Sequence, residues 1–130
     1  MRSEPAPETR RRAYRRGLGA ETLAVAWLCL KGYRILGRRF RAGAGEIDII
    51  ARKGDVVAFV EVKARRDADE ALAAIDARTR RRIAAAGRVW LARHPRYAAF
   101  TLRYDVILVA GHGLRRLVPR HMISAFLDGE

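Results

Sequence analysis

The sequence predicts an α/β domain built on one mixed β-sheet, and three observations lead to this fold class. Residues 18–31 are apolar almost all round, as in a helix that protein covers on most sides. Residues 33–64 hold three strand-like runs divided by turns that contain glycine. Residues 70–93 return to helical spacing and lead into another strand-like run. A chain of 130 residues has the usual size of one domain.

The first helix is expected to begin near Leu18 and to end at Gly32. Residues 1–16 differ in composition, because they combine two prolines and a run of arginines with no apolar pattern. We therefore divide the chain into a disordered, basic arm of residues 1–16 and a domain of residues 17–130. The arginines of the arm are either solvated or follow the phosphates of a nucleic acid. They are Arg10, Arg11, Arg12, Arg15 and Arg16.

Three strands are expected after the first helix, at residues 33–40, 46–52 and 56–64. Because short turns connect them, they are expected to form an antiparallel meander. The third strand is apolar on both faces up to residue 60, which is typical of a central strand covered on both sides.

The second half of the chain is expected to complete the sheet. A helix over residues 70–93 acts as a crossover that brings a strand at residues 102–110 parallel to the third strand. Arg103 and Asp105 alternate on that strand and are expected to form a structural pair. The resulting core has the order αβββαβ, with helices flanking a mixed sheet. Two shorter elements would end the chain, a strand at residues 114–118 and a helix at residues 119–127.

The charge of the chain favours an anionic partner. It carries 27 lysines and arginines against 14 aspartates and glutamates, which gives a net charge of +13. Nucleic acid is the first choice of partner, and an acidic membrane surface is the second. An arginine-rich composition can also reflect the composition of a genome.

The cysteine content and the apolar runs bear on localisation. The single cysteine, Cys29, excludes an intrachain disulfide and fits a reducing compartment. The apolar run of residues 23–30 is far shorter than the roughly 20 residues of a membrane span. No cleavage site of a secretion signal follows that run. We therefore expect a cytoplasmic protein with no membrane segment.

Charged residues interrupt two neighbouring apolar strands, with Asp48 inside the second strand and Glu61 and Lys63 at the end of the third. The hairpin between these strands decides whether the charged side chains meet. A two-residue type II′ loop at Gly54-Asp55 would place Asp48 opposite Glu61. The same register would place Glu46 opposite Lys63.

Opposed residues of an antiparallel pair have Cβ atoms about 4.5–5.5 Å apart, and two carboxylates at that distance repel unless a proton or cation lies between them. Oxygen ligands without cysteine or clustered histidine suit a hard ion such as Mg²⁺. Strand alternation would put Glu46 and Asp48 on one face and Ile47 and Ile49 on the other. Glu21, on the apolar stripe of the first helix, is a third acid of the site. The alternative is a cross-strand salt-bridge cluster on a solvated face.

A resemblance to a known family rests on the segment GEIDIIARKGDVVAFVEVKAR, residues 45–65. This segment resembles the signature of the YraN family of bacterial proteins, for which an endonuclease-like fold is expected. The likeness extends over residues 17–126 and includes GLGAETLA near the start, RYDVI at residues 103–107 and PRHMISAF near the end. That family resembles Holliday-junction resolvases and restriction-type nucleases with a PD-(D/E)xK motif. The resemblance implies a single restriction-endonuclease-like domain.

By this resemblance, Asp48 corresponds to the aspartate of the nuclease motif and Glu61 and Lys63 correspond to its E-x-K pair. Glu21 corresponds to an acid of the first helix. These four are the candidate catalytic residues, with Asp48 and Glu61 as ligands of Mg²⁺ or Mn²⁺. Glu46 is a secondary candidate.

The resemblance further implies a nuclease that acts on DNA rather than RNA, with branched or flapped DNA as the substrate to test and a homodimer as the assembly. Arg65, on the same face as Lys63, is a candidate contact for substrate phosphate or for a surface ion pair. Relatives often carry a lysine where this chain has Thr79, on the inward stripe of the second helix. This departure keeps an alternative open, a non-catalytic nucleic-acid-binding module with the nuclease fold.

Overall fold

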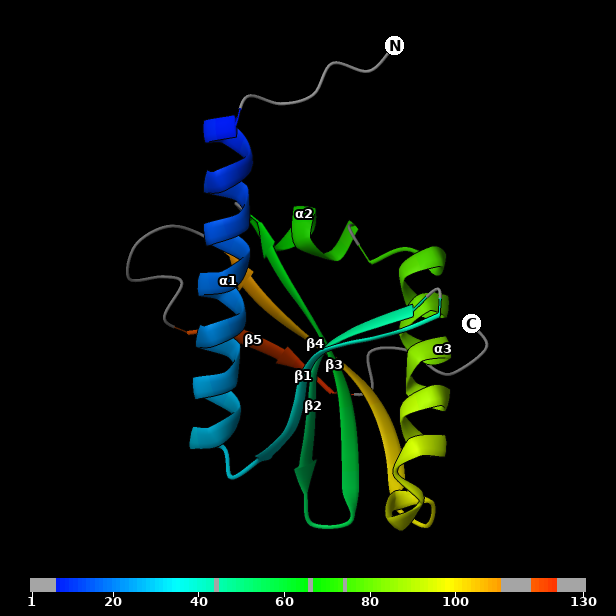
Figure 1. Cartoon of the computed structure of the whole chain (residues 1–130). Helices are drawn as coiled ribbons and strands as arrows, with labels where there is room; N and C mark the ends of the chain where they lie inside the picture. The colour runs from blue at the N-terminus through cyan, green and yellow to red at the C-terminus, as the bar shows by residue number, and fades with distance from the viewer. Residues whose placement is uncertain (1–6, 44, 66, 74, 111–117, 124–130) are drawn as a thin grey trace.

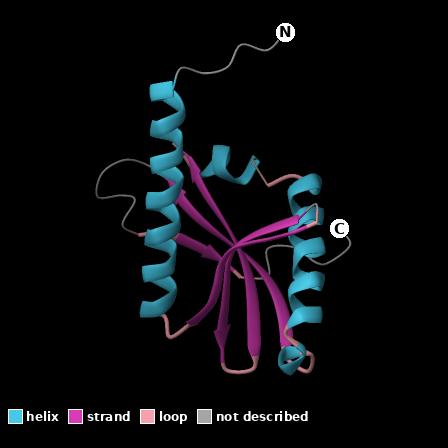
Figure 2. Ribbon diagram, viewed as in Figure 1, coloured by secondary structure: helices cyan, strands magenta, loops and turns pink. Residues whose placement is uncertain are grey.

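The computed structural model describes residues 7–43, 45–65, 67–73, 75–110 and 118–123. Figures 1 and 2 show one β-sheet between helices α1 and α3, with the short helix α2 near one end of the sheet. The elements in chain order are α1 (Pro7–Leu30), β1 (Arg34–Ala42), β2 (Gly45–Lys53), β3 (Val56–Arg65), α2 (Ala68–Ala73), α3 (Ala77–Arg93), a 3₁₀ turn (Pro95–Tyr97), β4 (Thr101–Ala110) and β5 (Arg120–Met122).

The strands lie in the order β1-β2-β3-β4-β5. The first three pair antiparallel, β4 runs parallel to β3, and β5 runs antiparallel to β4. The mixed sheet and the αβββαβ order that the sequence predicted are therefore confirmed. Helix α3 makes the crossover from β3 to β4, as a parallel pair requires.

The β2–β3 hairpin has the predicted register. Lys53 pairs with Val56, so that Gly54 and Asp55 form a two-residue loop. Gly54 has a φ of +61°, which glycine adopts at little cost and which the first position of a type II′ loop requires. From this loop the pairing continues outward to Ile49 and Val60.

Among the described residues, the two larger of three apolar clusters lie on opposite faces of the sheet, and the third is a small one around Val106 and Leu108 of β4. Ala58 and Val60 of β3 pack on the α1 side together with Leu28. Phe59 of β3 packs on the α3 side, where its ring meets Trp90 edge to face at 5.8 Å. Because all three β3 side chains are fully buried, the prediction of a central strand covered on both sides is confirmed.

Helix α1 begins at Pro7, earlier than the predicted start near Leu18. The arginines of residues 10–16 thus lie in a helix, and the prediction that they form a disordered arm is wrong. Residues 8–16 contain neither glycine nor proline, and arginine, alanine and glutamate are good helix formers. Pro7 suits the first helical position. The side chains of this stretch lie outside the described part, so their contact with phosphates stays a prediction.

The helix expected over residues 70–93 is two helices, α2 and α3. Helix α3 begins separately after Asp76, which caps it. The Asp76 side chain accepts a hydrogen bond from the backbone N–H of Thr79 at 2.9 Å. The inward stripe of α3 is as predicted, with Ile83, Ala86 and Trp90 buried.

The C-terminal prediction of a helix over residues 119–127 is wrong for residues 120–122, which form β5. Pairing with β4 brings His121 of β5 to Asp105, with 2.8 Å between Nε2 and Oδ2. This contact buries the polar side chain of His121 beside a carboxylate and explains why the segment is a strand. The strand expected at residues 114–118 lies, apart from Val118, outside the described residues.

No helix in the described part of the chain is long and apolar enough to cross a membrane.

Candidate active site

The sheet divides at one end, and the division creates the candidate site. Pairing between β2 and β3 stops at Ile49 and Val60, although both strands continue. The start of β2 stays paired with β1, and the end of β3 stays paired with β4. Figure 1 shows β1 and β2 turning toward α3 at this end while β3 continues in its own direction.

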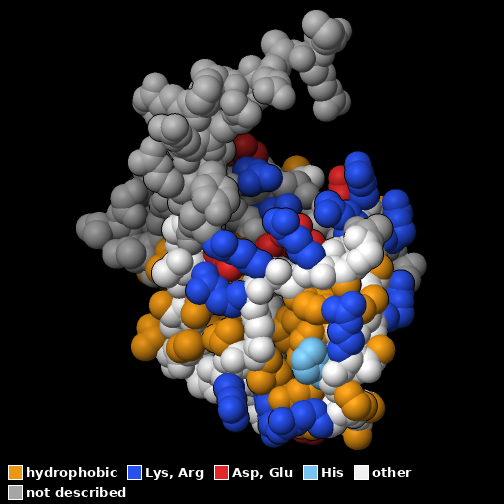
Figure 3. Space-filling view, in the orientation of Figure 1, with side chains coloured by type: hydrophobic (Ala, Val, Ile, Leu, Met, Phe, Trp, Pro, Cys, Tyr) orange, Lys and Arg blue, Asp and Glu red, His pale blue; other side chains and the backbone are white. Residues whose placement is uncertain are grey.

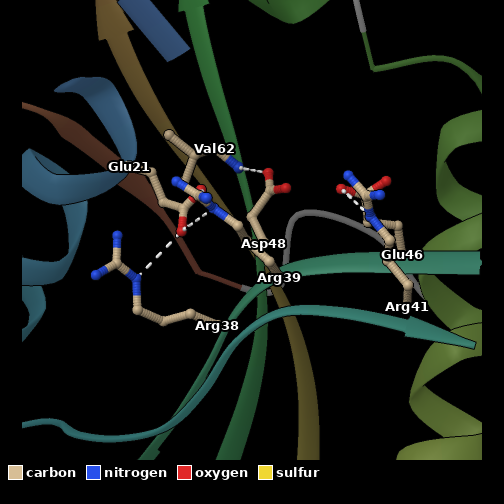
Figure 4. Close-up of polar contacts among 7 residues, drawn as sticks. All are labelled: Glu21, Arg38, Arg39, Arg41, Glu46, Asp48 and Val62. Carbon is tan, nitrogen blue, oxygen red and sulfur yellow. Dashed lines mark hydrogen bonds and ion pairs between the residues drawn. The ribbon is translucent and has the colours of Figure 1, made fainter. Parts of the chain in front are cut away.

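Asp48 lies at the point where the strands part. The backbone N–H of Val62 in β3 donates to Oδ2 of Asp48 at 2.8 Å, so a side chain replaces a main-chain acceptor of the ladder (Figure 4). The neighbouring strand is bent here as well, because Arg39 has a φ of +51°, in the left-handed region.

The bend corrects one prediction about strand alternation. Ile47 packs in the cluster on the α3 side, whereas Ile49 packs in the cluster on the α1 side. The two isoleucines were expected to share a face. Because β2 turns between them at Asp48, regular alternation is lost at this residue.

Gly45 allows the start of β2 to reach α3. A Cβ on this residue would lie 2.3 Å from the backbone oxygen of Arg82 and 2.7 Å from the backbone nitrogen of Ala86. Only a residue without a side chain can approach a helix backbone this closely. Gly45 therefore lets the start of β2 pack directly on α3, at the end where β2 and β3 are no longer paired.

A pocket of about 230 Å³ occupies the division, and α3 closes its far side. Asp48, Glu61 and Lys63 all line it, as the predicted register requires. Lys63 Nζ lies 3.0 Å from Glu61 Oε1, with only 16% and 12% of the two side chains exposed. The lining residues are Glu46, Asp48, Glu61, Lys63, Thr79, Arg82 and Ile83.

The electrostatics of the pocket centre on the carboxyl group of Asp48. Its burial and then the nearby charge of Glu61 raise the pKa of Asp48 to about 8, against the lowering effect of the hydrogen bond from Val62. The two carboxyl groups also hydrogen-bond to one another. Asp48 therefore holds a proton at neutral pH when no cation is close to the pair.

The donor set fits a hard divalent cation that brings its other ligands with it. Within the described residues, no group of three or more His, Cys, Asp and Glu side chains could hold a metal ion. Mg²⁺ commonly uses one or two carboxylates and completes its coordination with water and substrate phosphates. The Asp48–Glu61 pair meets that requirement, and a bound cation would take the place of the proton that Asp48 otherwise holds.

Glu21 lies outside the pocket, on the α1 side. It is 8% exposed, and it pairs with Arg38 Nε at 3.1 Å and with Arg39 Nε at 3.1 Å (Figure 4). Its charge contributes, as the smallest cause, to the raised pKa of Asp48. Glu21 thus acts on Asp48 through its charge, while its carboxylate is paired with Arg38 and Arg39.

Glu46 lines the pocket but does not meet Lys63, which it was expected to oppose. Its carboxylate lies 3.6 Å from Arg41 Nε and 3.9 Å from Arg82 Nη2, while Lys63 pairs with Glu61. The expected opposition fails because the β2–β3 pairing ends before Glu46 is reached.

Arg82 and Ile83 are pocket residues that sequence reasoning missed. A usable signal was present, because Thr79 was placed on the inward stripe and a residue three positions later lies on the same side of a helix. Thr79 does line the pocket. Arg82 therefore places a basic side chain in the lining of the pocket from α3, the helix that also carries Thr79.

Arg65 does not line the pocket. Its Nη1 donates to the backbone oxygen of Ala64 at 2.8 Å, and the residue is half-buried. A contact between Arg65 and substrate phosphate stays a prediction.

Fold and pocket together define a single-domain α/β protein with paired carboxylates and a lysine where two strands separate. The model of the uncharacterised protein family UPF0102 matches residues 20–109, a span that contains all four candidate catalytic residues. The chain belongs to this family, which is the YraN family that the sequence resembles.

Several family members are similar over nearly the whole chain. A UPF0102 protein of Methylobacterium nodulans is 56% identical over 123 residues, which cover 95% of this chain and 92% of the relative. A UPF0102 protein of Bradyrhizobium sp. is 54% identical, and the match covers 95% of this chain and 88% of the relative. One of Methylorubrum extorquens is 55% identical and covers 97% and 96%.

Proposed function

We propose that this protein is a metal-dependent nuclease that hydrolyses phosphodiester bonds in DNA, with branched or flapped DNA as the substrate class to test. One observation carries the proposal. Asp48 and Glu61 are forced together in the division between β2 and β3, and Lys63 lies 3.0 Å from Glu61 in the same pocket. A surface ion-pair cluster does not need a carboxyl group whose pKa is raised by burial to about 8.

The protein's own residues would divide the work as follows. Asp48 and Glu61 would hold Mg²⁺ or Mn²⁺, which when bound supplies a Lewis acid for a phosphate oxygen and for water. Lys63 would orient the attacking water and offset negative charge on the phosphate. Arg82 and Arg41, at the rim with Glu46, would receive the substrate backbone. Glu21 would act through Asp48, by its charge.

The charge of the whole chain supports a nucleic acid as the substrate. A net charge of +13 attracts a polyanion and raises the rate of encounter. The proposal places the protein in the cytoplasm, where DNA and Mg²⁺ are both present, and the exposed free thiol of Cys29 suits a reducing compartment. Cutting both strands of a branched substrate would require two sites, and hence a homodimer.

The test is cleavage of a panel of single-stranded, duplex, flapped and four-way DNA by wild type, Lys63→Ala and Lys53→Ala. Wild type should cut with Mg²⁺ or Mn²⁺ and not with a chelator. Lys63→Ala should lose about 10²–10³-fold in rate, the usual cost of removing one electrostatic group. Lys53→Ala is the matched control, because Lys53 is exposed at the β2–β3 hairpin. Cleavage that ignores metal, or equal rates for Lys63→Ala and wild type, would contradict the proposal.

The second candidate function is a non-catalytic nucleic-acid-binding module. It is favoured by Thr79, which cannot supply a charge to the pocket, and by the engagement of Glu21 with Arg38 and Arg39. Binding of the DNA panel without cleavage by any metal would select this function.

A further inference from the structure

Aromatic rings and arginines alternate on one surface at the C-terminal end of α3. We call this the aromatic–arginine surface. Its rings are half-buried and pack on the core cluster of the α3 side, and its arginines lie over rings. Figure 3 shows hydrophobic side chains around a histidine, with basic side chains beside them. The surface consists of Phe40, Arg52, Arg93, His94, Arg96 and Phe100.

The rings are held in a fixed stack. The His94 ring lies flat on buried Trp90, with centroids 4.3 Å apart and 15° between the planes, and Tyr97 stacks against Trp90 at 5.3 Å. Nδ1 of His94 lies 2.8 Å from the backbone oxygen of Trp90, so that the ring donates to it. His94 therefore has one face against Trp90 and is prevented from rotating. A ring fixed in this way binds another flat ring with little loss of conformational freedom.

The arginines give the surface a positive charge. Arg52 lies 4.7 Å above the Phe100 ring, Arg96 lies 5.0 Å above the Tyr97 ring, and Arg93 lies 5.7 Å from the Phe40 ring. Among the described residues, none of these three arginines forms an ion pair with a carboxylate. Their charge is thus available to a phosphate, while their planes can stack on a base.

The surface continues from the pocket. Arg82 lines the pocket and Arg93 belongs to the surface, and both lie on α3, where the helical rise separates them by about 16 Å along the axis. On the other side, Phe40 directly precedes Arg41, which pairs with Glu46 at the pocket rim. A strand of a few nucleotides can therefore reach from the pocket to the rings.

We propose that the aromatic–arginine surface binds unpaired bases of a single-stranded nucleic acid next to the pocket, with one base stacked on His94 and another on the guanidinium plane of Arg52, which the Phe100 ring supports. The inference rests on the proposed function in that the pocket takes a phosphodiester. Stacking needs a free base face, which a duplex does not offer, so the surface selects single strands, flaps and junction arms. The rings also close the core. Core closure does not require the three arginines, which form no ion pair with a carboxylate of the described residues.

Binding is measured with wild type in a chelator, so that no cleavage occurs. The probe is a fluorescent oligothymidylate that carries one 2-aminopurine, a base whose emission falls when it stacks. Wild type should bind this single strand more tightly than a duplex of equal length and should quench the 2-aminopurine. Phe100→Leu and His94→Asn should each weaken binding about 5- to 100-fold, the usual range for one stacked base. Both changes leave the charge of the arginines in place.

Leu30→Ala is the matched control, because Leu30 is apolar, 82% exposed and at the end of α1. It should bind as wild type does. Equal binding by wild type and both ring variants, or no quenching of 2-aminopurine by wild type, would overturn the inference. So would preference for vesicles of anionic lipid over the oligonucleotide. The quenching measurement needs no variant, so it decides even if a variant fails to fold.

The inference and the proposed function can fail separately. Stacking without metal-dependent cleavage would overturn the nuclease and leave the base-binding surface standing. Cleavage of duplex DNA that is unchanged in Phe100→Leu and His94→Asn would overturn the base-binding surface and leave the nuclease standing.

Discussion

Asp48 occupies the position where two strands part, and its carboxyl group needs either a proton or a cation. This need follows from burial and from the neighbouring charge of Glu61, which together raise its pKa to about 8 from an ordinary value of 3.8. The hydrogen bond from Val62 holds the side chain in place at the same time. The residue is thus fixed in an arrangement that is unfavourable without a ligand, as is common in functional sites.

The raised pKa predicts how the stability of the metal-free protein depends on pH. Because the folded pKa lies above the unfolded one, the contribution of Asp48 is complete below pH 3.8 and is lost as pH rises toward 8. In a chelator, the free energy of unfolding should therefore fall over this range more steeply for wild type than for Asp48→Asn. Urea denaturation at several pH values checks this, and parallel pH profiles for the two proteins would refute it.

A second prediction at this scale concerns Gly45. A Cβ in Gly45→Ala would overlap the α3 backbone at Arg82, so β2 and α3 must move apart. We expect a loss of about 1–3 kcal/mol in the free energy of unfolding, as for other overpacked sites. Gly19→Ala is the control, because nothing lies within 4 Å of the added carbon and a helix gains about 0.5–1 kcal/mol from this change. A stable Gly45→Ala protein would show that the close approach is not needed.

At the scale of elements, local chemistry predicted the β2–β3 hairpin, whereas contacts distant in sequence decided the parts that were missed. Gly54 carries a turn signal that fixes the register and brings Asp48 and Glu61 together. The bend at Asp48 depends on the packing of Gly45 on α3, which no neighbouring residue signals. Likewise, β5 forms because His121 meets Asp105 in β4, a contact between segments far apart in the chain.

A buried polar network joins β4, β5 and the turn that follows α1, and breaking it should lower stability. Asp105 is fully buried and accepts from Arg103 at 2.8 and 2.9 Å, which confirms their expected structural pairing. His121 also contacts Asp105, and its Nδ1 lies 2.6 Å from Lys31 Nζ. Asp105→Asn should lower the free energy of unfolding by about 3–5 kcal/mol, because it leaves Arg103 without its carboxylate partner in a buried site.

Urea denaturation with Asp55→Asn as the control measures this effect, since Asp55 is exposed in the β2–β3 turn. A loss no larger than that of the control would show that the network adds little stability.

At the scale of the whole molecule, the excess of basic residues predicts how nucleic-acid binding responds to salt. A footprint of six to ten phosphates implies a loss of about 10³–10⁵ in affinity between 50 and 200 mM salt. A net charge of +13 is sufficient for such a footprint. Titration of labelled DNA at several salt concentrations checks this. Affinity that does not change with salt would count against nucleic acid as the partner.

The most direct test of the account is a thermal melt of wild type and Asp48→Asn, each with and without millimolar Mn²⁺. If Asp48 and Glu61 form a cation site, Mn²⁺ should raise the melting temperature of wild type. At a Mn²⁺ concentration a hundred times the dissociation constant, binding adds about 2.7 kcal/mol to the free energy of unfolding. Asp48→Asn should show no such rise, and without metal it should melt at or above wild type, because the neutral amide avoids the cost of ionising a buried carboxyl group beside Glu61. A wild type that ignores Mn²⁺, together with a less stable Asp48→Asn, would contradict the cation site and leave a structural salt-bridge cluster in its place.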